Sequence, residues 1–280
     1  MIAVAFWGLT RSTQYTAESI HRHLLVRLPP HRVFLHTYSS NTPYRNARAG
    51  ESASQIQADY AALHPYQVQV DDLDQVKARI DLNAYHDQPD PWGTNYEAVD
   101  NFVLAMYSKS RVTEMISSSG LDIAAVIFVR PDVRYLAAVP PLLTLAGPDA
   151  WVIPAFHLYS NFNDRFCIAS KGNYTVYGNV FPLLLRYSKM KRMHSETFYA
   201  DLARAAGIRL VYAPPSFVFQ RIRTNGQTDP RDLLLHKPVH RVRRQTANTG
   251  QVHLHHGVFG NLPLRKPFAA RGFVDGVGPV

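Results

Sequence analysis

The sequence has little cysteine and no long apolar run, and each absence excludes a class of protein. A single cysteine, Cys167, leaves no partner for an internal disulfide, so we expect folding in a reducing compartment. No segment approaches the roughly 20 apolar residues of a membrane span. Residues 2–7 are apolar but follow no basic segment, which predicts a strand rather than a secretion signal. The expected location is the cytoplasm.

Several enzyme motifs are also missing. The sequence holds no Gly-x-Ser-x-Gly, no Walker phosphate loop, no His-Glu-x-x-His and no Cys-x-x-Cys. Its composition is that of a globular protein, with 46% hydrophobic and 18% charged residues. A chain of 280 residues is long enough to bury one large core.

Positive charge is in excess and unevenly placed. The net charge is +9, from 30 Lys and Arg against 21 Asp and Glu. Residues 227–280 hold eight basic and three acidic side chains. A basic protein favours anionic partners such as nucleic acid, anionic lipid or the phosphates of a nucleotide. Nucleic acid is the least favoured of these, because the basic segment has few aromatic side chains on which bases could stack.

Short apolar runs alternate with helical periodicity along residues 1–226. Strands are predicted over 2–7, 33–37, 66–70, 124–129, 151–156, 165–169, 208–212 and 217–222. Helices are predicted over 13–28, 52–63, 72–80, 95–118, 174–188 and 195–206. This alternation predicts an α/β domain, Rossmann-like, with a mainly parallel sheet flanked by helices. Beyond Gly226 the pattern decays, which predicts a basic, Pro- and Gly-containing extension over 227–280.

Ligands of such sheets bind at the carboxyl ends of strands, and two segments stand there. Residues 7–12 lie between the first strand and a helix, where Gly8 permits close backbone approach and Arg11 can pair with a phosphate. Asp132 follows the most apolar strand between Arg130 and Arg134, where it could hold a metal-bound diphosphate or a sugar hydroxyl. The alternatives are an ordinary turn with a surface arginine and a local ion pair.

Other charged residues could either bind a ligand or only stabilise the fold. Arg221 and Arg223 alternate along a predicted strand, so both would face one side and suit a diphosphate. Glu196 follows the predicted helix cap Ser195, and is a general-base candidate or an acidic residue that favours a helix N-terminus. Three further carboxylates lie in loops or turns, where they could bind substrate or cap helices: Asp164, Asp71 and Asp72.

In this order the segments resemble GT-A-type glycosyltransferases, in particular those of large algal viruses and the WavE-type lipopolysaccharide-synthesis proteins. The resemblance spans residues 5–226 and is carried by segments 5–12, 33–37, 127–135, 163–166, 195–196 and 221–226. It implies a GT-A-like fold and inverting transfer of a sugar from a nucleotide-sugar to a hydroxyl of an acceptor glycan. Within the viral group the chain looks most like the capsid-glycan β-xylosyltransferases of chloroviruses. That likeness implies UDP-xylose as donor, the N-glycan of a viral capsid protein as acceptor, and the host cytoplasm as location.

The resemblance also implies residue roles. Asp132 occupies the position of the family's Asp-x-Asp motif, but Arg134 replaces the second carboxylate. Asp132 would therefore hold Mn²⁺ or Mg²⁺, or the mechanism is metal-independent with an arginine in place of the cation. Glu196 falls where inverting members carry their base, with Asp164 as the rival. The nucleotide would be held by Gly8, Leu9, Thr10, Arg11, Asp71 and Asp72, with Arg130, Arg221 and Arg223 near the diphosphate.

Two other functions remain open from the sequence. A non-catalytic glycan- or nucleotide-binding protein would explain the incomplete Asp-x-Asp motif. A basic RNA-binding protein would explain the net charge of +9.

Overall fold

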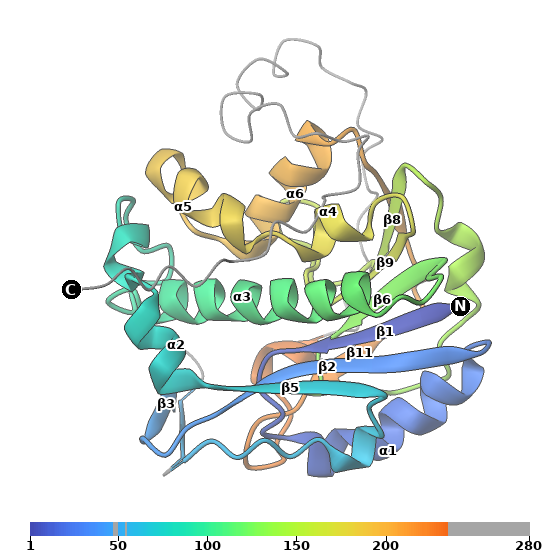
Figure 1. The fold of residues 1–280 in the computed structure, drawn as a ribbon, viewed down its shortest axis with the longest axis horizontal. Coiled ribbons are helices and arrows are strands. Elements are labelled where there is room, and N and C mark those ends of the chain that lie inside the picture. Colours follow the sequence, from blue (N-terminus) through green and yellow to red (C-terminus); the bar gives the residue numbers. More distant parts are fainter. Residues whose placement is uncertain (47–49, 54, 235–280) are drawn as a thin grey trace.

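The computed structural model describes residues 1–46, 50–53 and 55–234. Its centre is a seven-stranded sheet in the order β10-β8-β9-β6-β1-β2-β5 (Figure 1). Every strand runs parallel to its neighbours except β9, which is antiparallel to β6 and β8. The strands are β1 (Ile2–Trp7), β2 (His31–Ser39), β5 (Gln67–Asp72), β6 (Ala125–Val129), β8 (Ala150–Ile153), β9 (Phe166–Ser170) and β10 (Arg209–Tyr212). The predicted α/β class with a mainly parallel sheet is confirmed.

Helices cover both faces of this sheet (Figure 1). One face carries α3 (Glu97–Ser118), α4 (Tyr174–Gly178), α5 (Phe181–Met190) and α6 (Ser195–Ala205). The other carries α1 (Thr13–His23) and a ladder of β7 (Val133–Tyr135) with β11 (Phe219–Arg221). Side chains of β1 alternate between the two faces, as a strand buried on both sides requires: Ala3, Ala5 and Trp7 face α3, whereas Ile2, Val4 and Phe6 face α1.

Smaller elements complete the described part. A hairpin pairs β3 (Tyr44–Asn46) with β4 (Glu51–Ala53), and α2 (Leu73–Arg79) follows β5. Single 3₁₀ turns are η1 (Leu25–Arg27), η3 (Ala61–Leu63), η4 (Leu82–Tyr85), η5 (Leu142–Leu145) and η6 (Pro230–Leu234). Among the described residues, no helix combines the length and apolar character needed to cross a bilayer.

Two predicted helices were wrong in detail. The helix expected over 52–63 is absent, because residues 51–53 form β4 and Ile56 exchanges backbone hydrogen bonds with Ser40. Long-range strand pairing overrides a weak helical pattern here. The helix expected over 13–28 ends at His23. The strand expected over 165–169 is confirmed as β9. Its antiparallel direction was not predicted, because local sequence does not encode it.

The start of the predicted extension belongs to the packed core. Asp229 and Asp232 are 1% and 0% exposed, and Asp232 pairs with Arg165 at 2.8 Å. The described residues 227–234 therefore pack against the domain. The rest of the extension, residues 235–280, lies outside the described residues.

Candidate functional site

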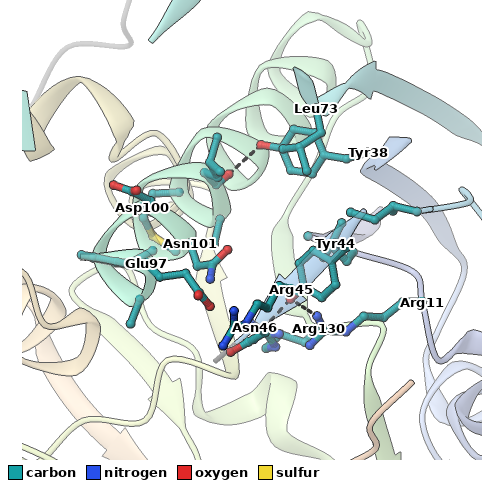
Figure 2. Close-up of a pocket in the computed structure, with 18 of the residues that line it drawn as sticks. Arg11, Tyr38, Tyr44, Arg45, Asn46, Leu73, Glu97, Asp100, Asn101 and Arg130 are labelled. Carbon is teal, nitrogen blue, oxygen red and sulfur yellow. Dashed lines mark hydrogen bonds between the residues drawn. The ribbon is translucent and has the colours of Figure 1, made fainter. Parts of the chain in front are cut away.

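A pocket of about 430 Å³ opens at the carboxyl edge of the central strands (Figure 2). Strand register creates it: Phe6 pairs with Val129, and Val129 pairs with Phe166. Because β9 runs antiparallel, its start lies beside the ends of β1 and β6. Residues that follow β1 and β6 and residues that precede β9 therefore meet at one edge.

Arginines dominate the lining. Seven arginines and one lysine face four carboxylates, with Glu97 and Asn101 of α3 on the side opposite Arg11 and Arg130 (Figure 2). The lining cations are Arg11, Arg45, Arg130, Arg165, Arg221, Arg223, Arg231 and Lys77, and the carboxylates are Glu97, Asp100, Asp164 and Glu196. This excess of positive charge suits a polyanionic ligand.

The structure brings most of the predicted site residues to this pocket. It is lined by Gly8, Leu9, Arg11, Arg130, Asp164, Glu196, Arg221 and Arg223. Thr10 is buried beside it, with its hydroxyl 3.3 Å from that of Thr37. Four predicted residues do not line the pocket: Thr10, Asp71, Asp72 and Asp132. The binding and catalytic roles predicted for all of these residues stay predictions.

Gly8 follows β1 with φ of +91°, a conformation that favours glycine. Its amide donates a 2.8 Å hydrogen bond to Ser108 Oγ on α3. The amide is therefore used inside the protein, and Gly8 contributes to the pocket through its lack of a side chain.

Three pocket arginines hold buried donors that lack partners. The Nε atoms of Arg11, Arg221 and Arg223 are buried and have no hydrogen-bond partner among the described residues. An unsatisfied buried donor costs about 1–3 kcal/mol, so an anion that accepts from these groups would bind favourably. Arg11 still pairs with Glu51 at 3.1 Å and bonds Tyr44, which keeps it in place.

Arg221 is the least satisfied of the three. Its nearest carboxylate contacts are 3.7 Å to Asp132 and 3.9 Å to Asp229, beyond hydrogen-bond distance. Burial, and then the charge of Arg130, lowers the pKa of Arg221 to about 9.

The expectation that Arg221 and Arg223 share a strand was wrong, because β11 ends at Arg221. Both nonetheless line the pocket, since a turn after β11 carries Arg223 back toward Glu51.

Asp132 does not fit a metal ligand. Both its oxygens accept hydrogen bonds from Arg130, at 2.8 and 2.7 Å, and its side chain is 2% exposed. Burial would raise the pKa of Asp132, but Arg130 holds it far below its usual value. No group of three or more His, Cys, Asp or Glu side chains within residues 1–46, 50–53 and 55–234 is placed to hold a metal ion. Arg134 bonds Thr228 at 3.2 Å and does not line the pocket.

Asp164 and Glu196 form a carboxylate pair in the same pocket. Burial would raise the pKa of Asp164, but the charges of Lys109 and Arg130 hold it below its usual value. Burial, and then the negative charge of Asp164, raises the pKa of Glu196 to about 7. Ser195 is not the helix cap that was predicted. His194 precedes the helix, and Ser195 Oγ donates to Glu196 Oε2 at 2.8 Å.

Lys109 is a fully buried cation whose charge acts on Asp164. Its ammonium is 4.1 Å from the ring centre of Trp7 and 4.4 Å from those of Tyr177 and Tyr199. It donates a 2.8 Å hydrogen bond to the Tyr199 hydroxyl. Burial lowers the pKa of Lys109 to about 7, although Asp164 opposes that shift. Lys109 thus places a titratable cation within electrostatic reach of Asp164.

Asp71 and Asp72 have structural partners at the end of β5. Asp71 Oδ2 lies 3.2 Å from His36 Nε2 and accepts from the Tyr107 hydroxyl at 3.1 Å. His36 in turn contacts Ser108 Oγ at 2.8 Å, the atom that holds the Gly8 amide. Asp72 caps α2 by accepting from two backbone amides.

The sequence argument missed several residues of the site. Lys109 carried a signal, because it continues the inward face of α3 three residues after Met106, and a charge on an apolar face is unusual. Arg165 stands next to Asp164 in the chain. Glu51, which pairs with Arg11 and Arg223, gave no signal because its partners are far away in sequence.

Comparison with known proteins identifies no family by sequence. No family model matches the chain, and no curated protein does. Among solved structures, mouse xyloside xylosyltransferase 1 in its apo form is similar with a TM-score of 0.40 and 10% identity, over 76% of this chain and 85% of that one. A glycosyltransferase involved in the glycosylation of the major capsid of PBCV-1 is similar with a TM-score of 0.37 and 12% identity, over 76% of this chain and 81% of that one. At such low scores and identities neither similarity carries a functional argument.

Proposed function

We propose that this chain is an inverting glycosyltransferase that binds a nucleoside-diphosphate sugar in the arginine-lined pocket. One observation carries the proposal: buried, unsatisfied arginine donors and a carboxylate with a pKa of about 7 line the same pocket. The arginines suit a diphosphate. The carboxylate suits the removal of a proton from a hydroxyl near neutral pH.

The proposed reaction is a single displacement. Glu196 takes the proton of an acceptor hydroxyl, whose oxygen forms a bond to the anomeric carbon of the donor sugar. The bond from that carbon to the diphosphate oxygen breaks from the opposite side, which inverts the configuration. Arg11, Arg221 and Arg223 stabilise the negative charge that builds up on the leaving diphosphate.

Asp164 has a different role in this scheme. Its low pKa keeps it ionised, so it raises the pKa of Glu196 and attracts the positive charge that develops on the sugar ring. Two carboxylates with separated pKa values are the pattern expected of an acid–base site.

We propose metal-independent transfer, because Asp132 is fully engaged by Arg130. The guanidinium groups take the part that Mn²⁺ or Mg²⁺ would otherwise play.

The resemblance of segments 5–226 supports UDP-xylose as donor and a glycan of a capsid protein as acceptor, with the reaction in the cytoplasm of an infected cell. A thermal-shift panel of nucleotide-sugars tests the donor. A ligand at 100 times its dissociation constant adds about 2.7 kcal/mol to stability. We expect UDP-sugars to raise the melting temperature, with the largest rise for UDP-xylose. Nucleoside monophosphates should raise it little.

A non-catalytic nucleotide- or glycan-binding protein is the second candidate, favoured by the single carboxylate at the Asp-x-Asp position. It predicts the same thermal shifts without release of the nucleotide from the donor. RNA binding at low salt and no shift with any nucleotide-sugar would favour the basic RNA-binding alternative.

A further inference from the structure

A chain of ring contacts joins an exposed tyrosine to the lining of the pocket. Tyr159 is 57% exposed, and its ring lies 4.1 Å from that of His194 at an angle of 34°. His194 also stacks against Trp92, at 5.3 Å and 27°. Trp92 lines the pocket, and His194 Nδ1 lies 3.3 Å from Glu196 Oε2. These three rings, the aromatic platform, thus adjoin the proposed base.

A tight hairpin holds Tyr159 in place. Tyr159 and Phe162 exchange two backbone hydrogen bonds of 3.0 and 2.9 Å. The two residues between them, Ser160 and Asn161, have φ of +51° and +62°, the pattern of a type I′ turn. Left-handed backbone at a non-glycine residue persists where the surroundings hold it, and it clusters at ligand sites.

The hairpin is anchored at three points. Phe162 is fully buried and stacks on Tyr199 at 5.3 Å. The Tyr212 hydroxyl donates to the backbone oxygen of Asn161 at 2.9 Å. The Ser160 hydroxyl lies 3.0 Å from that of Thr197, in the first turn of α6. The same turn carries Glu196, so Tyr159 and the proposed base are held in one rigid arrangement.

We propose that the aromatic platform is an acceptor subsite that binds a pyranose ring of a glycan by stacking on Tyr159. This inference rests on the proposed function of the pocket. The axial C–H bonds of a β-pyranoside form an apolar face, and the electron-rich face of an aromatic ring attracts them. Tyr159 reaches Glu196 only through His194, which packs against one face of the Tyr159 ring. A glycan whose acceptor hydroxyl lies beside the base would therefore place a neighbouring sugar ring on the exposed face of Tyr159, which favours a glycan over other occupants.

The test uses methyl β-D-glucopyranoside as the probe, observed by saturation-transfer NMR with the full chain in saturating UDP. We expect transfer to concentrate on the axial protons H1, H3 and H5, and to be absent for glucitol, which has similar hydroxyls but no ring. Tyr159→Ala should weaken the probe by about 2- to 10-fold, the range of an aromatic pair. Tyr159→Phe should retain binding.

Tyr66→Ala is the matched control, because Tyr66 is 54% exposed and precedes β5, at the edge of the sheet opposite the pocket. It should leave the probe signals unchanged. Three results would each overturn the subsite. The probe could give equal signals with Tyr159→Ala and the wild type, it could give no signal with the wild type, or its signal could be lost when UDP is added. The last result would place the base of the nucleotide on the platform instead.

UDP calorimetry on the same samples separates the two proposals. If the wild type binds the probe through Tyr159 but does not bind UDP, the subsite stands and the transferase assignment fails. If UDP binds equally to the wild type and Tyr159→Ala while the probe signals are the same in both, only the subsite fails.

Discussion

Arg221 Nε lies 3.7 Å from Asp132 Oδ2, too far for a hydrogen bond, although both side chains are largely buried. Both oxygens of Asp132 accept hydrogen bonds from Arg130, so the carboxylate is oriented toward Arg130 rather than Arg221. Buried polar groups in proteins nearly always have a hydrogen-bond partner, which can be the protein, an ordered water or a bound ion. The buried Nε donor of Arg221, which has no partner among the described residues, is the most specific indication that the pocket binds an anion.

Replacement of Arg221 should therefore weaken binding of UDP. A hydrogen bond to a charged group contributes about 1.5–3 kcal/mol, so Arg221→Ala should raise the dissociation constant about 10- to 150-fold. Isothermal calorimetry with UDP measures this. Arg134→Ala is the control, because Arg134 pairs across the same ladder but lies outside the pocket. Equal affinities for all three proteins would remove Arg221 from the site.

The rate should depend on pH through Glu196. Its pKa is raised to about 7, and only the ionised form can accept a proton. We expect kcat/KM to rise with pH up to about 7 and then level off. The Glu196→Gln variant should lose this rise and keep a low, flat rate. A profile that is flat in the wild type between pH 5.5 and about 8 would contradict the assignment.

The contribution of Glu196 to the free energy of unfolding should fall as pH rises, whereas the rate should rise. Because the folded-state pKa of Glu196 lies above its unfolded value of about 4.3, its contribution is full below pH 4.3 and is lost as pH rises through about 7. Urea unfolding at several pH values should show Glu196→Gln gaining stability relative to the wild type as pH increases. The same relative stability at all pH values would show that the carboxyl titrates normally.

Removal of divalent metal should have no effect. In the proposed mechanism the arginine cluster takes the part of a metal ion, and both oxygens of Asp132 accept hydrogen bonds from Arg130. Release of nucleotide in EDTA should match that in Mn²⁺. A loss of activity in EDTA that Mn²⁺ restores would contradict the metal-independent proposal.

Asp71 should prove structural rather than donor-binding. Asp71→Asn would weaken its contact with His36 and so loosen Ser108 and the loop at Gly8. Contacts with His36, opposed by burial, lower the pKa of Asp71, so the stability it contributes is present above about pH 3.9 and lost as pH falls further. Urea unfolding should show the variant less stable at pH 7 and closer to the wild type below about pH 3.9. Lower UDP affinity with unchanged stability would instead support the donor role that the sequence suggested.

The sequence predicted most of the fold because its signals were local. Strand β1, helix α3 and strand β6 each show their periodicity within a single segment. The direction of β9 and the short strand β4 depend on partners far away in the chain, and neither could be inferred locally.

The residues of the candidate site could also be predicted only in part. Arg11, Asp164 and Glu196 could be picked out because they stand next to strand and helix ends. The partners that decide their chemistry could not, since the pairing of Asp132 with Arg130 on both oxygens and the contact of His194 with Glu196 need coordinates. Local sequence placed candidates at the sheet edge, whereas tertiary packing determined which of them carry unsatisfied charge.

The most direct test is the rate of UDP release from UDP-sugars, UDP-xylose first, by the wild type, Glu196→Gln and Asp164→Asn. General-base assistance contributes about 100- to 10,000-fold, so Glu196→Gln should slow release by that order while its UDP affinity, measured by calorimetry, stays unchanged. Inability of the wild type to bind UDP or to release it from any UDP-sugar would contradict the glycosyltransferase assignment. Full activity in Glu196→Gln with loss in Asp164→Asn would show that Asp164 is the base.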